Sequence, residues 1–200
     1  TRFITTAVPN SSRNRMRNGL TGFVEGRVIR YSALPTADLN VRKLAAIEAL
    51  SRNGDVQGKW LDSITIEPNL WPTSAVLDWL AILKRKPGIN AQSGRLAEGA
   101  QQVIRSRLNF QGTTMGFSTE RNDTLWWLMI NGDVNANRAL LSLLELPNWQ
   151  PDIPRLVRGT LGRQLRGHWS TTVSNAWGVL AMKKFSARFE AVPVTGTSTA

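Results

Sequence analysis

Four segments of the chain share one pattern, in which a threonine follows Pro or Ser and precedes an apolar run. A threonine at a helix N-cap accepts a hydrogen bond from an otherwise unpaired first-turn amide, and an apolar residue just outside the helix can pack back on that turn. The pattern therefore predicts four helices that begin at equivalent positions. The threonines are Thr36, Thr73, Thr119 and Thr171, in ALPTADLNVRKLAAI, LWPTSAVLDWLAIL, GFSTERNDTLWWLMI and HWSTTVSNAWGVLAM.

The runs that follow these threonines are apolar on most sides, and a helix of that kind lies in the interior of a protein. In the second run, the apolar residues between Val76 and Leu83 leave little polar surface. Two segments between the repeats differ, because their apolar residues fall on one side of a helix and arginines fall off it. These segments, Leu96 to Leu108 and Ile153 to Leu165, predict outer helices with one solvated face.

Repeats of paired helices that cannot bury their faces alone must stack or close on themselves. The strongly apolar capped helices favour closure, so we expect an all-α fold: an α/α toroid of helical-hairpin repeats with inner and outer helices, as a partial or reduced ring. Residues 1–30 would form an N-terminal lead-in that can include one toroid helix, interrupted by Gly19 and Gly22. Residues 31–190 would form the toroid, and residues 191–200 the start of a following strand or tail.

The composition excludes several kinds of active site. The chain has no cysteine and one histidine, which excludes disulfides, thiolate metal sites and cysteine nucleophiles. Glu120 and Asp123 are the best-placed carboxylate pair, but the helix dipole already explains acidic residues in a first turn. A glycosidase pair facing each other across a cleft is the alternative. We expect no catalytic, cofactor-binding or metal-binding residues and no cofactor.

The single histidine, His168, lies beside a Trp-Ser-Thr sequence at the start of the fourth predicted helix. Ser170 is two residues away, but the sequence identifies no acid to orient a catalytic pair. We therefore expect His168 in a loop before the helix, and Trp169 packed against its own helix or a neighbouring outer one. Trp126 and Trp127 would point about 100° apart on one helix. We expect core packing, with one ring facing the core and the other an inter-helix contact, and stacking on sugars or bases as the alternative.

The net charge of +11 fits either solvated cationic faces or an anion-binding surface. The basic residues are scattered, and the densest groups are Arg13 to Arg17 and Lys84 to Lys86. The second group ends an apolar run, where cations complement the helix dipole. We expect the basic residues to lie on solvated faces and at helix ends, and we expect no nucleic-acid partner. No apolar run reaches the length of about 18 residues that spans a membrane.

Several segments together resemble a known family. GHWSTTVSNAWGVLAMKKFS is similar to the late helix of the thioester domain in the alpha-2-macroglobulin and complement family, and MGFSTERNDTLWWLMI to an earlier inner helix. NVRKLAAIEALSR, LDSITIEPNLWPTSAVLDWL and LNFQGTTMGFSTER resemble the bacterial alpha-2-macroglobulin-like proteins. The resemblance covers roughly residues 30–190 and implies the later part of a thioester-type α/α toroid.

The resemblance implies no reactive residue in this chain, because the family's thioester forms between Cys and Gln of a Cys-x-Glu-Gln motif and the chain has no cysteine. That motif lies near the start of the family's domain, so either it lies upstream of this piece, or the parent protein belongs to the bacterial branch that lacks a thioester. The implied function is a scaffold and interaction domain of a protease-trapping protein, an endopeptidase inhibitor, and not an enzyme. Its partners would be proteases and other domains of the same full-length chain.

The implied location is periplasmic or associated with the outer envelope, with any signal or lipid anchor outside this piece. Two other functions stay open at this stage. One is an α/α-toroid carbohydrate-active enzyme, either a lyase or a glycoside hydrolase, which clustered acids would favour. The other is a basic helical-repeat module that binds anions, which Arg and Lys clustered on one face would favour.

Overall fold

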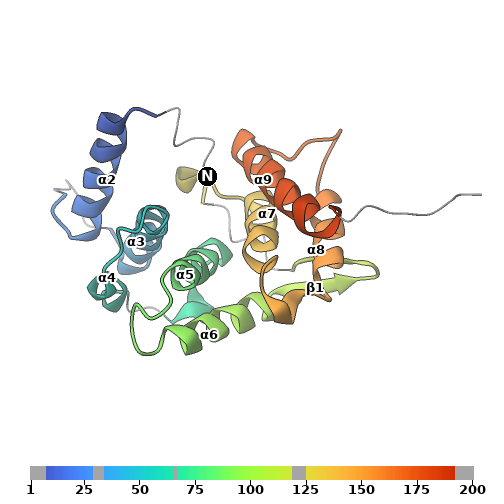
Figure 1. Cartoon of the computed structure of the whole chain (residues 1–200), viewed down its shortest axis with the longest axis horizontal. Coiled ribbons are helices and arrows are strands. Elements are labelled where there is room, and N and C mark those ends of the chain that lie inside the picture. Colours follow the sequence, from blue (N-terminus) through green and yellow to red (C-terminus); the bar gives the residue numbers. More distant parts are fainter. Residues whose placement is uncertain (1–7, 29–33, 65–66, 119–124, 192–200) are drawn as a thin grey trace, which may run out of the picture. The chain divides into compact units, whose positions relative to one another are not determined.

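The computed structural model describes residues 8–28, 34–64, 67–118 and 125–191 (Figure 1). This part of the chain is mostly helical, which confirms the all-α expectation at that level, and its only sheet is a two-stranded hairpin. The α-helices are α2 (Asn10–Val24), α3 (Thr36–Ser51), α4 (Gly58–Asp62), α5 (Thr73–Arg85), α6 (Ser93–Ser106), α7 (Gly132–Leu143), α8 (Ile153–Leu161) and α9 (Thr172–Phe189). The strands are β1 (Leu108–Gln111) and β2 (Thr114–Phe117), and short 3-10 turns cover Pro68–Leu70, Trp126–Leu128 and Pro147–Trp149.

The contacts within the chain define two compact units, residues 1–103 and residues 104–200. In the first unit, α3 packs against both α2 and α5. In the second unit, α7 packs against α8 and α9, and β2 packs against α8. In both units, therefore, helices that are separated in sequence by another helix lie in direct contact. None of the described helices combines the length and the apolar character needed to cross a bilayer.

Helix α5 is the interior helix expected for the second repeat. Every residue from Thr73 to Leu80 is buried, as are Ile82 and Leu83. The ring of Trp79 meets Trp71, just before the helix, edge to face at 5.6 Å between ring centroids. Helix α8 is the one-sided outer helix expected, with Ile153, Leu156 and Val157 buried. It ends at Leu161, short of the predicted end, because a tight turn follows.

The three threonines of the pattern that the structure describes do mark helix starts, but only one of these three caps its helix. Thr36 and Thr73 are the first helical residues, and the prolines before them occupy the N-cap position without a side-chain capping bond. Proline holds the extended backbone that an N-cap needs but carries no side-chain acceptor. Thr171 is the N-cap of α9 and accepts a hydrogen bond from the Ser174 amide at 3.1 Å.

The helix predicted after Thr119 is wrong over the part that the structure describes. Thr119, Glu120 and Asp123 lie outside the described residues. Leu125 and Ile130 close an antiparallel bridge around a 3-10 turn, and Met129 has a left-handed φ of 56°. The next helix, α7, begins only at Gly132, where Asn131 accepts a hydrogen bond from the Val134 amide at 2.9 Å.

The hairpin was not expected. The helix predicted to reach Leu108 ends at Ser106, and β1 begins at Leu108 instead. Gly112 turns the chain with a φ of 58°, and β2 then lies against α8. The contact needs a glycine on α8: a Cβ added at Gly159 would lie 2.0 Å from the Met115 carbonyl oxygen. The strand is therefore held in place by a residue far away in sequence.

Two further elements differ from expectation in detail. Helix α2 confirms a helix in the lead-in, and it runs through Gly19 and Gly22 without interruption. Helix α9 was expected in the interior, but only its small residues Ser174, Gly178 and Ala181 are buried, and Val179 is 66% exposed. The small residues serve close contacts: Ser174 accepts a hydrogen bond from Asn137 of α7 through its carbonyl, and Gly178 leaves room for the Trp169 ring.

Candidate functional site

The HWSTT segment enters α9 through a tight turn that joins it to α8. Leu165 and His168 exchange backbone hydrogen bonds of 2.9 and 3.3 Å. Between them, Arg166 and Gly167 both have left-handed φ values, of 55° and 80°. Two successive left-handed residues are typical of the tightest hairpin turns. The turn places His168 on the surface and directs Trp169 inward.

The HWSTT segment, together with the parts of α7, α8 and α9 that it contacts, forms a joint between these helices. Trp169 is buried at its centre, at 4% exposure. Its Nε1 donates a hydrogen bond to the Thr160 carbonyl of α8 at 3.0 Å, and its ring lies directly against Gly178 of α9. The side chain of Asn175 accepts from the Trp169 amide at 3.1 Å and donates to its carbonyl at 2.8 Å. We expected Trp169 to pack against its own helix or a neighbouring one, and it contacts both α9 and α8.

Ser170 and Asp133 join the start of α9 to the first turn of α7. One carboxylate oxygen of Asp133 accepts from the Ser170 amide at 2.9 Å and from its hydroxyl at 2.6 Å. The other oxygen accepts from Arg163 Nε at 2.7 Å. Burial raises the pKa of Asp133, but the hydrogen bonds from Ser170 and Arg163 together outweigh it, so the pKa lies below its ordinary value. Asp133 is therefore a structural carboxylate that stays ionised.

A second set of hydrogen bonds runs beside this one between α7 and α9. Asn131 donates to the Ser170 hydroxyl at 3.2 Å and accepts from the Ser174 hydroxyl at 3.2 Å. Deeper in the contact, Asn137 donates to the Ser174 carbonyl at 3.1 Å. Because Asn131 also caps α7, one side chain fixes the starts of both helices.

These contacts decide what the joint can do chemically. The Ser170 hydroxyl donates to Asp133, whereas Nδ1 of His168 lies 3.0 Å from the Trp169 carbonyl oxygen. An activated serine needs its hydroxyl hydrogen-bonded to the base, with the base oriented by the acid. Here the acid accepts the serine's hydrogen bond directly, and Nδ1 of the histidine contacts a backbone carbonyl instead. The geometry favours a structural joint over a nucleophilic centre.

Sequence reasoning missed three residues of this joint: Asp133, Arg163 and Asn131. The signal for Asn131 and Asp133 was an Asn-Gly-Asp sequence, which is typical of a helix start with an acidic first turn. Because an apolar run lies just before this sequence, the helix was predicted to begin too early in the chain. The asparagine four residues after Thr171 was the other available signal, since Asn175 bonds back to the carbonyls of Trp169 and Thr171.

The remaining sequence candidates do not gather at one place. Glu120 and Asp123 lie outside the described residues, so their pairing stays a prediction. Within the described ranges, no group of three His, Asp or Glu side chains could hold a metal ion. The expectation that Trp126 and Trp127 pack in the core is wrong, because they are 77% and 40% exposed. The bridged turn, unlike a helix, holds both rings outward, edge to face at 5.9 Å.

The Lys84 to Lys86 group contributes one buried ion-pair cluster. Glu48 of α3 is buried and accepts hydrogen bonds from Arg85 at 2.7 Å and from Arg52 at 2.8 Å. Arg85 also donates to the Ser51 hydroxyl at 2.9 Å. The cluster joins α3 to the end of α5.

Comparisons of the chain with models of known protein families, with curated proteins and with solved structures find no match.

Proposed function

We propose that the chain is a scaffold and interaction domain of a bacterial alpha-2-macroglobulin-like protein, which traps proteases in the cell envelope. The observation that carries the proposal is the joint around Trp169. One of the segments that resemble the family, GHWSTTVSNAW, is the one whose side chains connect α7, α8 and α9. A motif used in this way supports a binding framework, not a reaction.

The packing within each unit supports the α/α toroid that this proposal includes. Within the first unit α3 contacts α5, and within the second α7 contacts α9. An α/α toroid places alternate helices side by side in its inner ring, with one-sided helices such as α8 outside. In this proposal α3 and α5 in the first unit, and α7 in the second, are inner helices.

A binding experiment tests the proposal directly. The chain is immobilised and exposed to serine, cysteine and metalloproteases with blocked active sites, and association is followed by interferometry. The proposal expects saturable binding of at least one protease class, and no turnover of polysaccharides by the same preparation. Failure to bind any class, with the chain shown to be folded, would remove the proposed partner.

A carbohydrate-active enzyme is the second candidate, and one observation favours it. The exposed rings of Trp126 and Trp127 present faces on which sugars can stack. Glu120 and Asp123 precede them in sequence. Hydrolysis or elimination of a polysaccharide that is lost in Glu120→Gln or Asp123→Asn, with folding unchanged, would promote this function over the first.

A further inference from the structure

Helix α2 leaves most of its own surface uncovered. Of its fifteen residues, only Gly22 and Val24, near its C-terminal end, are buried. Met16, in its middle, is 55% exposed. A helix of this length is marginal in water unless tertiary packing supports it. The N-terminal two-thirds of α2 is therefore a surface that a partner would stabilise.

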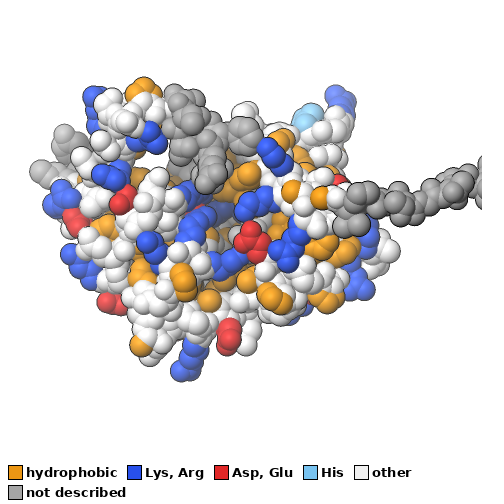
Figure 2. Space-filling model, viewed as in Figure 1, with side chains coloured by type: hydrophobic (Ala, Val, Ile, Leu, Met, Phe, Trp, Pro, Cys, Tyr) orange, Lys and Arg blue, Asp and Glu red, His pale blue; other side chains and the backbone are white. Residues whose placement is uncertain are grey.

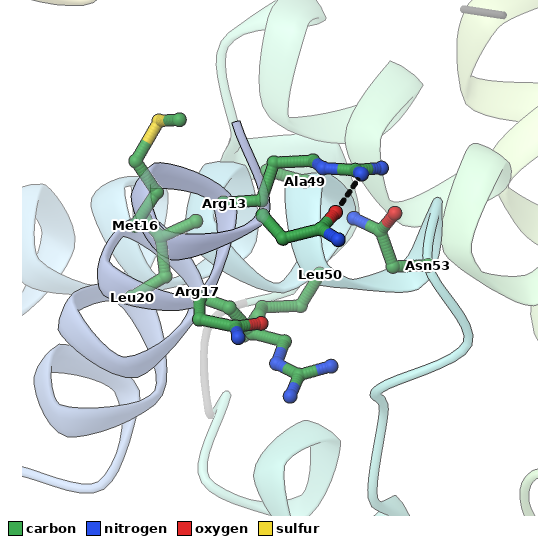
Figure 3. A pocket seen from close by; sticks show the side chains of 9 residues that line it. Arg13, Met16, Arg17, Leu20, Ala49, Leu50 and Asn53 are labelled. Atoms are coloured by element: carbon green, nitrogen blue, oxygen red, sulfur yellow. Dashed lines mark hydrogen bonds between the residues drawn. The ribbon is translucent and has the colours of Figure 1, made fainter. Parts of the chain in front are cut away.

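The open part of α2 faces α3 across a groove of about 390 Å³. Figure 3 shows Arg13 and Arg17 reaching from α2 toward α3, with Leu50 between them in this view. Leu20 and Leu50 form its apolar floor, with Asn53 at the α3 end. The groove therefore combines an apolar floor with cationic and amide groups, all within the first unit.

The charge of the groove is positive. None of the described residues that line it is acidic. Arg13 hydrogen-bonds the neutral Asn10 side chain, and Arg17 meets Asp55, which lies outside the lining, at 3.4 Å with both side chains solvated. Solvated pairs of this kind are weak, so the cations stay available. Basic side chains also predominate over acidic ones on the face that Figure 2 shows.

We infer that this groove, lined by Arg13, Met16, Arg17, Leu20, Leu50 and Asn53, docks a carboxylate-rich peptide segment of a partner protein. Its aspartate or glutamate side chains pair with Arg13 and Arg17. A leucine-sized side chain covers the floor at Leu20 and Leu50 and removes it from water. The Asn53 amide is placed to bond the peptide backbone. This assignment holds whether or not the partner is a protease.

Fluorescence anisotropy with a dye-labelled synthetic peptide, in which Asp and Glu alternate with Leu, tests the inference. A second peptide replaces each acid by Asn or Gln and keeps the leucines. We expect the acidic peptide to bind at least about tenfold more tightly than the neutral one, because charge complementarity sets specificity. Equal binding of the two peptides, or binding of neither, would overturn the assignment.

A matched pair of variants separates the groove from the general charge of the chain. Arg13→Glu and Arg15→Glu change the net charge equally on the same helix, but Arg15 does not line the groove. We expect Arg13→Glu to weaken peptide binding by about tenfold and Arg15→Glu by no more than about twofold. Met16→Ser, at an exposed position in the lining, should weaken it by about threefold by removing apolar surface from the groove. Far-UV circular dichroism checks that each variant keeps its helices.

The other occupants of the groove have distinct signatures. Equal losses in Arg13→Glu and Arg15→Glu would mean that only the overall charge attracts the peptide. Concentration-dependent dimers in sedimentation, abolished by Arg13→Glu, would assign the groove to a second copy of the chain. Binding to phosphatidylglycerol vesicles that the acidic peptide does not displace would assign it to a membrane surface. Each of these results would overturn the inference.

Discussion

The substitution Gly178→Ala tests the joint where its packing is tightest. A Cβ at this position would lie 2.2 Å from one carbon of the Trp169 ring and 2.5 Å from two others. Carbon atoms pack at about 3.5–4.0 Å, so the ring or the helix would have to move by roughly 1 Å or more. The ring has little freedom to move, because it is buried and its Nε1 is bonded to Thr160.

The expected loss follows from two opposing effects. Overpacking a filled site costs about 1–3 kcal/mol, whereas replacing a glycine by alanine inside a helix favours folding by about 0.5–1 kcal/mol. We therefore expect Gly178→Ala to lower the free energy of unfolding by about 1–2 kcal/mol. Trp169→Ala removes a buried ring and should cost about 3–5 kcal/mol.

The double variant Trp169→Ala/Gly178→Ala tests whether the Trp169 ring rests on Gly178. In the Trp169→Ala background the added methyl meets vacated space, so Gly178→Ala should now stabilise the fold by about 0.5–1 kcal/mol. Urea unfolding of the four proteins by circular dichroism measures all three changes on one scale. If Gly178→Ala has the same sign and size in both backgrounds, the Trp169 ring does not rest on Gly178 and the described joint is wrong.

Three further predictions concern charge and exposure. Because the pKa of folded Asp133 lies below its ordinary value, its contribution to the free energy of unfolding is complete above about pH 4 and is lost as the pH falls through the folded pKa. In urea unfolding at decreasing pH, Asp133→Asn should therefore reduce the loss of stability at acid pH. Glu48→Ala should cost about 3 kcal/mol in the same assay, the lower end of the range for breaking a buried pair, since both arginine partners keep access to water. Trp126→Ala should change stability by less than about 0.5 kcal/mol and remove the emission component most accessible to a soluble quencher.

The elements that sequence reasoning predicted well are those fixed by their own apolar pattern. Helix α5 is apolar on nearly every side and α8 on one side, and both show the predicted burial, although α8 is shorter than predicted. Helix α7 was missed because its first turns are polar, with Asn131 and Asp133 serving the joint to α9. The apolar residues before it, including Trp126, occupy a bridged turn that no helical periodicity signals.

The contacts that build the candidate site are long-range, and this is why they escaped prediction. The hairpin depends on Gly159 of α8 leaving room for Met115. The Ser170 side chain finds its acid on a different helix, at Asp133, and not beside it in sequence. Spacing along the chain identified the histidine and the serine but did not indicate how they would be oriented.

The central claim is that this chain binds a partner and that its HWSTT segment is a structural joint. The most direct test measures protease binding, polysaccharide turnover and urea unfolding side by side for the unaltered chain and for His168→Ala. We predict protease binding that His168→Ala leaves intact, no turnover by either protein, and a stability change within about 0.5 kcal/mol, as for other surface substitutions. If His168→Ala keeps the stability of the fold but abolishes binding or an activity, the turn is a functional site and not a structural joint.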